Sequence, residues 1–367
     1  MAVYKIFPEK DATIYSLFPT MNTGIDEILD ISNLNFSISS NAQVARYLIK
    51  FNQEQLNNAV NNLADGAQWD ADLRCFIATA QGINIDSYLE VYPVSGSWGM
   101  GTGKYLDQPI VTNGTSWQWR TFEGGIAWAT SSANPNVTAS YSGSNYGGGN
   151  WYGTPSANQE FTYNSDKDLK VSVTDFIDTW YSGTISNDGF IVKWEDIIEF
   201  NQNLNVQPVL QYYSMDTHTI YPPCIDFKWN DFTYNTSSNI PLLTTPQAYL
   251  SIANNNGFFY SQSVQEFRVD CRPQYPPIVF QTASIYTQNY YLPTASYWAI
   301  KDLDTNEYVI DFDSTYTKLS ADTTSSLFTV YMNGLQPERY YTILIQTTIG
   351  GTTQVIDSNY NFKVING

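Results

Sequence analysis

Five tryptophans gathered in one stretch are the residues of this sequence with the clearest capacity for binding. Residues 95–160 are rich in Gly, Ser and Trp, lack strand periodicity, and contain Trp98, Trp117, Trp119, Trp128 and Trp151. An exposed indole can stack on the C–H face of a sugar ring, while nearby Asn, Gln and Asp side chains bond its hydroxyls. Several exposed indoles would also form a large apolar patch, so packing in the core or between subunits is the alternative. We expect a long ordered loop region or an excursion at a sheet edge.

Few residues have the types and spacing that catalysis requires. The single histidine, His218, has no second His or Cys near it, so no zinc site, Ser-His-Asp triad or Cys-His pair can be assembled locally. We expect His218 at the surface or at the rim of a core. Carboxylates are numerous enough for glycoside hydrolysis, but their separation cannot be read from a sequence. We therefore expect no enzyme, no cofactor and no metal site, with a polysaccharide depolymerase as the enzyme-class alternative.

One acidic segment imitates the opening of a calcium-binding loop. In "DLDTNE", Asp302, Asp304 and Asn306 have the right spacing, but Glu307 stands where the sharp turn of such a loop needs glycine. The segment lies between two alternating runs, "YWAIKDL" and "EYVIDF". A hairpin turn through residues 304–306 explains this pattern without a metal.

The cysteines give no sign of a disulfide framework. Cys75, Cys224 and Cys271 are odd in number, widely spaced and placed in apolar runs. We expect all three to be small buried hydrophobic residues.

Composition and charge exclude several classes of protein. The 367 residues include 17 Lys and Arg against 35 Asp and Glu, a net charge of −18, which argues against binding nucleic acid. The 28 Tyr, 19 Phe and 10 Trp exclude disorder, because such a chain must bury apolar area. The beginning has no basic segment followed by an apolar one, so no signal peptide is expected, and no stretch reaches the ~18 apolar residues of a membrane span.

Alternating apolar residues predict strands along most of the chain. Runs with a period of two are Leu73/Cys75/Ile77, Leu169/Val171/Val173, Phe190/Val192/Trp194 and Ile225/Phe227/Trp229. Helical patterns are scarce. One follows Asn52, a good N-cap, with Leu56, Val60 and Leu63 on one face. A shorter one starts at Thr174 and has Phe176, Ile177 and Trp180 on one side, with Gly183 placed to end it. The predicted fold class is all-β, with multi-domain β-sandwiches and one or two short helices.

Shifts in composition predict three parts of the chain. Residues 1–232 form the first β-sandwich, with the Trp/Gly-rich insertion at 95–160, and residues 233–272 are a linker or connecting strands. Residues 273–367 alternate strands and turns at the spacing of a second β-sandwich.

The first ~230 residues resemble the DNRLRE-type β-sandwich domain, a relative of carbohydrate-binding modules. The opening "DATIYSLFPTMNTG" carries Asp11, Asn22 and Gly24, and "ARYLIKFN" and "TNGTSWQW" follow. The most specific part is "VSVTDFIDTWYSGTISNDGFIVKW", with these matching residues: Asp175, Trp180, Gly183, Asn187, Gly189 and Phe190. The resemblance implies a jelly-roll-like sandwich. The chain departs from this family in its long tryptophan insertion and in lacking the arginine-rich motif. Sugar binding is therefore not inferred for this chain from the resemblance.

The last ~95 residues resemble a fibronectin type III or immunoglobulin-like domain. In "GLQPERYYTILI", Leu335, Pro337 and Tyr341 have the spacing of a tyrosine corner, where a tyrosine hydroxyl bonds backbone a few residues upstream.

The whole chain is similar to virion structural proteins of tailed, cyanophage-like marine phages. This resemblance rests on the "YKIFPEKDATIYS" opening, the Asn/Tyr/Thr-rich composition and the order of β-domains. It implies a non-enzymatic tail, baseplate or neck protein, made in the host cytoplasm and located in the virion, that serves as a β-domain spacer and docking element. Its partners would be other virion proteins and further copies of itself. The alternative is a host-attachment adhesin that binds surface polysaccharide through the tryptophan loops.

Overall fold

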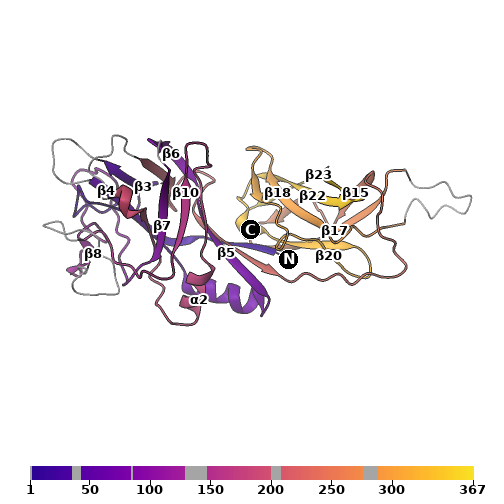
Figure 1. Cartoon of the computed structure of the whole chain (residues 1–367), viewed down its shortest axis with the longest axis horizontal. Coiled ribbons are helices and arrows are strands. Elements are labelled where there is room, and N and C mark those ends of the chain that lie inside the picture. The colour runs from indigo at the N-terminus through magenta and orange to yellow at the C-terminus, as the bar shows by residue number, and fades with distance from the viewer. Residues whose placement is uncertain (1, 35–42, 84–85, 129–146, 200–207, 276–287) are drawn as a thin grey trace, which may run out of the picture. The chain divides into compact units, whose positions relative to one another are not determined.

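The chain is organised as two compact units. A computed structural model describes residues 2–34, 43–83, 86–128, 147–199, 208–275 and 288–367. The N-terminal unit comprises Ile6–Asn58 and Asp70–Asp226, and the C-terminal unit comprises Met1–Lys5, Ala59–Trp69 and Phe227–Gly367. The backbone therefore passes from one unit to the other four times, after residues 5, 58, 69 and 226. Both units are built from β-sheets (Figure 1), which confirms the predicted all-β class.

The largest sheet of the N-terminal unit has eight strands. Their order is β10 (Ala157–Phe161), β7 (Ser87–Pro93), β12 (Phe190–Trp194), β4 (Gln43–Phe51), β3 (Ile28–Leu34), β13 (Val209–Tyr213) and β6 (Ile77–Gln81), with β2 (Pro8–Tyr15) also paired to β4. In a further sheet, β11 (Leu169–Ser172) pairs antiparallel with β5 (Gln68–Cys75). Two more strands are β1 (Ala2–Ile6) and β14 (Cys224–Asn230). Within the N-terminal unit, Tyr47 on β4 contacts Cys75 on β5 through a hydroxyl-to-sulfur distance of 3.4 Å.

Strand β12 occupies the middle of the large sheet and shows why its sequence is apolar throughout. It pairs antiparallel with β7 on one side and β4 on the other, so that Phe190 lies opposite both Pro93 and Ile49. All five of its residues are buried, because both faces of this central strand are covered. The alternating pattern in its sequence predicted burial of one face only, whereas both faces of the strand are buried.

Two of the short helices were predicted from their sequence signals. The amide groups of Glu54 and Gln55 donate to the Asn52 side chain, which caps α1 (Gln53–Asn58). A turn of π-helix, Ala59–Ala64, continues it. The second predicted helix is α2 (Thr174–Tyr181), which buries Phe176, Ile177 and Trp180, and Gly183 adopts φ +72° after its end. A further short helix, α3, spans Asp196–Glu199.

The C-terminal unit is a sandwich of two sheets (Figure 1). One sheet has the order β15 (Ala248–Ala253), β17 (Val264–Pro273), β21 (Ser326–Tyr331) and β20 (Ser320–Ala321). The other has the order β16 (Phe258–Tyr260), β23 (Thr352–Ile365), β22 (Tyr340–Ile349), β18 (Ser296–Asp302) and β19 (Tyr308–Ile310). Side chains of both sheets meet in one core, where Trp298 of β18 stacks on Phe328 of β21 with ring centroids 5.0 Å apart.

The predicted tyrosine corner is present in the C-terminal unit. The hydroxyl of buried Tyr341 donates to the carbonyl oxygen of Gln336 at 3.0 Å, five residues upstream. Leu335 is buried in the same core and Pro337 is partly buried beside it. The sequence spacing was sufficient to predict this hydrogen bond because its donor and acceptor lie in one short segment.

Residues 233–272 were expected to be a linker or connecting strands, and they form strands that belong to the C-terminal unit. Residues 233–272 include β15, β16 and most of β17, and their side chains Leu250, Ile252 and Phe267 belong to the C-terminal core. They are part of a domain, because each strand buries one face in the sandwich. The first strand also belongs to the C-terminal unit, where Val3 enters the core and the Lys5 carbonyl accepts a bond from Asn333 at 2.7 Å.

We expect the change Tyr341→Phe to destabilise the C-terminal unit by about 1 kcal/mol, since it leaves the Gln336 carbonyl without its buried donor. Urea unfolding of the full chain measures the change. Tyr340→Phe is the matched control, because the neighbouring Tyr340 side chain is exposed. Equal midpoints for the two variants would contradict the role given to the corner.

Candidate functional site

A fully buried ion pair lies inside the N-terminal unit. Arg46 on β4 donates from Nε and Nη2 to the two carboxylate oxygens of Glu199 on α3, at 2.7 and 2.8 Å. Neither side chain is exposed to solvent. Lys193, also buried, places its Nζ 3.8 Å from Glu199 and 2.9 Å from Glu90. Burial of these charges is tolerated because each has a partner of opposite charge in direct contact.

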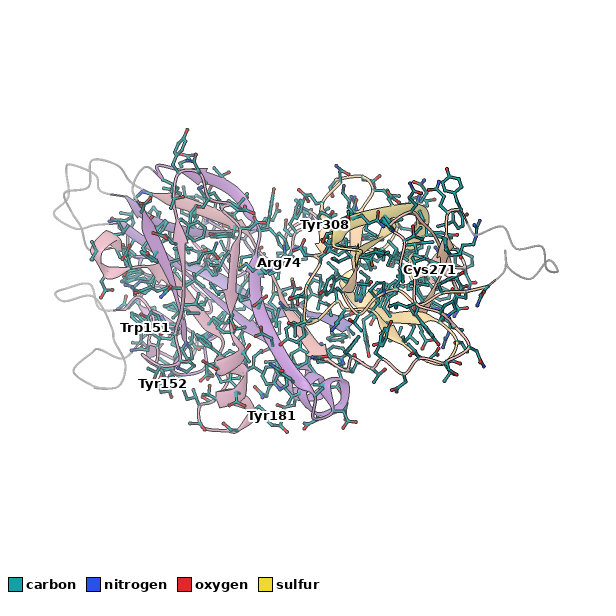
Figure 2. All side chains as sticks on the ribbon, turned by 45° about the vertical axis from the view of Figure 1, so that its right-hand side comes forward. Arg74, Trp151, Tyr152, Tyr181, Cys271 and Tyr308 are labelled. Atoms are coloured by element: carbon teal, nitrogen blue, oxygen red, sulfur yellow. The ribbon has the colours of Figure 1, made fainter. Side chains whose placement is uncertain are left out.

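Two of the five tryptophans enclose this arginine. The guanidinium carbon of Arg46 lies 5.0 Å from the ring centroid of Trp117 and 5.2 Å from that of Trp151 (labelled in Figure 2). Both distances are within the range of cation–π attraction. Nη1 of Arg46 donates to the carbonyl of Gly148. A Cβ at Gly148 would lie 2.8 Å from both Arg46 and Trp117, so only glycine allows the chain this close.

Two further indoles bond to backbone. Nε1 of Trp98 donates to the Asp188 carbonyl at 2.8 Å, and Nε1 of Trp128 donates to the Ser116 carbonyl at 2.9 Å. The Lys10 ammonium lies 4.3 Å from the Trp98 ring centroid. These contacts use the polar edge of each indole inside the protein.

The tryptophans were expected either to bind a glycan or to pack in a core, and four of them pack in a core. Trp98, Trp117, Trp128 and Trp151 are each 3% exposed or less and belong to one apolar cluster. They present no open face on which a sugar could stack, so their assignment as glycan contacts is wrong. Trp119 is half-buried on the short hairpin of β8 (Trp119–Thr121) and β9 (Ile126–Ala127), against Phe122.

Asn22, in the opening segment "DATIYSLFPTMNTG", holds together the loops that carry the tryptophan cluster. Asn22 is buried, and its amide nitrogen donates to the carbonyls of Met100 and Thr115 at 2.6 and 2.8 Å. Its side-chain oxygen accepts bonds from the amides of Gly24 and Gly103. One asparagine thus makes four bonds that position the loops bearing Trp98 and Trp117.

Asp11 of the same motif is a buried carboxyl group. Its Oδ2 accepts the amide of Met215 at 2.7 Å, and Oδ1 has no hydrogen-bond partner among the described residues. Burial raises the pKa of Asp11 to about 8, and the charges of Asp216 and Asp26 add to the increase. At neutral pH this site therefore favours the protonated carboxyl.

An open pocket lies beside the N-terminal strands, and sequence reasoning missed it. It has a volume of about 430 Å³ and includes Tyr15, Phe18, Asp26, Asp30, Tyr105 and Gln211 in its walls. The Asp30 carboxylate accepts bonds from Tyr15 and, at 2.7 Å, from Gln211. The ring of Tyr105 lies 4.8 Å from that of Tyr15, and 43% of Tyr105 is exposed. These residues come from distant parts of the chain, so no local pattern could have grouped them.

A second, smaller pocket in the C-terminal unit contains a cysteine. Cys271, labelled in Figure 2, lines it together with Tyr249, Asp270, Arg272 and Asn289. Burial raises the pKa of the Cys271 thiol to about 12, with the Asp270 charge adding to it. The thiolate needed for nucleophilic chemistry is therefore scarce at neutral pH. Cys75 and Cys224 are likewise buried, as expected for small core residues.

The other candidate residues occupy structural positions. His218 is 88% exposed, with Nε2 3.7 Å from Glu27. Asp302 ends β18, accepts two bonds from Arg339, and bonds the amides of Asp304 and Thr305 in the predicted hairpin turn. Across the described ranges, no three His, Cys, Asp or Glu side chains are grouped so as to hold a metal ion. Within the same ranges, no helix has the length and apolar character to cross a bilayer.

Comparisons with known proteins give no family for this chain. No protein-family model matches it, and no curated protein matches it. A DUF4785 family protein from Legionella pneumophila is 9% identical with a TM-score of 0.19, and the match covers 99% of this chain and 62% of that one. A structure described as a receptor binding domain is 9% identical with a TM-score of 0.18, covering 96% and 67%. The botulinum neurotoxin serotype D/C binding domain is 10% identical with a TM-score of 0.16, covering 96% and 68%. Likenesses this weak carry no argument.

We expect Glu199→Gln to destabilise the N-terminal unit by about 3–5 kcal/mol, because it leaves the Arg46 guanidinium buried without its counter-charge. Chemical unfolding followed by tryptophan fluorescence measures this, since Trp117 and Trp151 contact Arg46. The control is Glu9→Gln, which breaks the partly exposed Lys50–Glu9 pair and should cost less than about 1 kcal/mol. A similar loss of unfolding free energy in both variants would show that the buried pair stabilises the unit no more than the partly exposed one.

Asp11 predicts a defined pH dependence. Its pKa is about 8 in the folded chain against 3.8 ordinarily, so between these values the folded state binds a proton that the unfolded state releases. Asp11 therefore lowers the free energy of unfolding progressively as pH rises from about 4 to about 8. At about 1.4 kcal/mol per pKa unit, the total loss is a few kcal/mol.

The variant Asp11→Asn mimics the protonated carboxyl and can still accept the Met215 amide bond. We expect its unfolding free energy, relative to the unmodified chain, to increase between pH 5 and pH 8. Urea unfolding at three pH values within that range measures the difference. A constant difference would mean that Asp11 titrates normally in the folded protein.

Proposed function

We propose that the protein is a non-enzymatic structural component of a bacteriophage particle, associated with the tail, baseplate or neck. In this proposal its two β-units serve as a spacer, and an exposed face of the C-terminal unit docks another virion protein. The likeness of the sequence to virion proteins of tailed phages supports the viral setting. The observation that carries the docking role is a row of two exposed aromatic side chains with a lysine between them on one sheet.

This row crosses three neighbouring strands of the C-terminal unit. Phe258 on the edge strand β16 lies opposite Lys363 on β23, and Lys363 lies opposite Tyr340 on β22. Phe258 is 55% exposed and Tyr340 is 51% exposed. The Lys363 ammonium lies 5.8 Å from the Tyr340 ring centroid and pairs with Glu338. We call Phe258, Lys363 and Tyr340 the aromatic row.

The position of the aromatic row at a sheet edge favours a binding role. Strand β16 has only three residues and ends the five-stranded sheet, with Phe258 and Tyr260 both more than half exposed. Exposed aromatic side chains at an edge are a liability for a protein that stays alone, because they promote association. Aromatic residues are also enriched where proteins bind one another, with a polar rim around them. Lys363 and Glu338 supply such polar neighbours.

The proposal is tested on intact particles of the phage whose genome encodes this chain. We expect mass spectrometry of gradient-purified virions to detect peptides from both units in a fixed ratio to the major structural proteins. Absence of the chain from the particles would overturn the proposal.

The docking role has its own test in particles assembled with variant chains. Phe258→Asp places a charge in the aromatic row and is expected to reduce incorporation by at least about tenfold, as loss of a central interface contact does. The control is Tyr163→Asp in the N-terminal unit, where Tyr163 is 77% exposed and outside the row. Normal incorporation of the Phe258 variant would locate the docking surface elsewhere.

A further inference from the structure

The open pocket of the N-terminal unit has a size suited to a small molecule. Its volume of about 430 Å³ falls within the range of about 300–1,000 Å³ that is usual for ligand sites. Tyr105, Phe18 and Tyr15 supply aromatic walls, with Phe18 6.1 Å and Tyr15 4.8 Å from the Tyr105 ring centroid. Tyr105 is 43% exposed, so this wall of the pocket is accessible from solvent.

Carboxylates supply the only charges in the described lining of this pocket. Asp26 and Asp30 are both in the walls, and no described residue that lines the pocket is Lys, Arg or His. The lysine at the neighbouring position, Lys104, pairs with Glu27 at 3.5 Å. Two negative charges beside aromatic rings therefore meet no cation in the pocket itself.

The two carboxylates are held in different ways. Both oxygens of Asp30 accept hydrogen bonds, from Tyr15 and Gln211, so its position is fixed. Asp26 accepts the Tyr105 amide through Oδ2 at 2.9 Å, while no described residue contacts its Oδ1 as a hydrogen-bond donor. The pocket thus combines one fixed carboxylate with one that has an oxygen available for a ligand.

The ionisation of neighbouring groups is consistent with this uncompensated charge. The pKa of Asp30 is raised by burial, and the charge of Asp26 raises it further. The pKa of Tyr105 is likewise raised by burial and then by the charges of Asp30 and Asp26. An added negative charge is therefore disfavoured here, and an added positive charge is favoured.

We propose that this pocket binds an organic ammonium group, which the rings of Tyr105 and Phe18 contact while Asp26 and Asp30 neutralise its charge. Aromatic walls with nearby carboxylates match the chemistry of a cation that carries carbon substituents, because the rings attract the charge and also cover its apolar surface. A metal ion, by contrast, has no apolar surface for the rings to cover. The site is independent of the aromatic row and of the docking role proposed for the C-terminal unit.

Calorimetric titration of the full chain with choline chloride tests the site, with 3,3-dimethylbutan-1-ol as an uncharged ligand of the same shape and sodium chloride matching the ionic strength. We expect choline to bind roughly tenfold more tightly than the alcohol. We also expect the choline affinity to fall with added salt, because the pocket is open to solvent. Equal binding of the two compounds, or no binding of choline at millimolar concentration, would overturn the proposal.

Variants locate the binding and separate it from folding. Asp26→Asn keeps an acceptor for the Tyr105 amide but removes the charge, and Tyr105→Leu removes one aromatic wall. Each is expected to weaken choline binding roughly tenfold without a change in unfolding midpoint. The control is Tyr163→Leu, at an exposed tyrosine of the same unit outside the pocket. Unchanged affinity in both pocket variants would place the binding elsewhere and contradict the proposal.

A last pair of titrations distinguishes two sources of the ammonium group. Glucosamine compared with glucose reports an amino sugar, and vesicles of phosphatidylcholine compared with phosphatidylglycerol report a lipid headgroup. Preference for the charged sugar over glucose assigns the pocket to amino sugars, and binding to the choline vesicles alone assigns it to headgroups. Failure of both cationic probes and of free choline would reject the ammonium site while leaving the docking role untouched.

Discussion

The buried ion pair between Arg46 and Glu199 is the constraint on which the N-terminal unit depends. A guanidinium without solvent must have its charge and its donors satisfied, and three separate segments do this for Arg46. Glu199 supplies both carboxylate oxygens, Gly148 supplies a carbonyl, and the faces of Trp117 and Trp151 cover the planar group. Because these segments are distant in sequence, satisfying one side chain requires the sheet, the glycine-rich segment and α3 to meet. Gly148, Trp117 and Trp151 of the insertion each meet part of this requirement.

Neutral amide side chains hold further loops among the described residues of this unit. Asn22 bonds the backbone at four points around the tryptophan loops, and Asn187 donates to the Phe51 carbonyl at 3.0 Å while accepting the Gly189 amide. A Cβ at Gly189 would lie 2.4 Å from the Ile49 carbonyl, so this turn also needs glycine. An asparagine combines a donor with an acceptor and can satisfy buried backbone groups without burying a charge. This explains how a chain with few charged residues can carry long ordered loops.

Sequence reasoning succeeded where the determining contacts are local. The cap at Asn52, the buried face of α2, the hairpin after Asp302 and the Tyr341 corner each depend on residues only a few positions apart. The fold class followed from the period-two runs for the same reason. The domain boundaries failed because the first strand and the 233–272 segment belong to a unit whose core lies mostly later in the chain.

The candidate sites required the tertiary structure for the same physical reason. Whether an indole is exposed depends on what covers it, and the cover for Trp117 and Trp151 is an arginine far away in sequence. The pocket likewise combines Tyr15, Tyr105 and Gln211. Composition showed that the chain is acidic, but only the structure shows where two carboxylates remain in a pocket without a basic lining residue.

Because the indoles are buried, exposed tyrosines are the better candidates for contact with a partner. Of the large apolar side chains that the structure describes as exposed, tyrosine is the most frequent type, whereas no tryptophan is among them. A tyrosine can remain at a surface because its hydroxyl bonds water while its ring stays available to a partner. Tyr105 lines the pocket of one unit and Tyr340 lies in the aromatic row of the other, each beside charged residues. The two proposed binding surfaces therefore use the same chemistry, while four of the tryptophans lie in the packed core of the N-terminal unit.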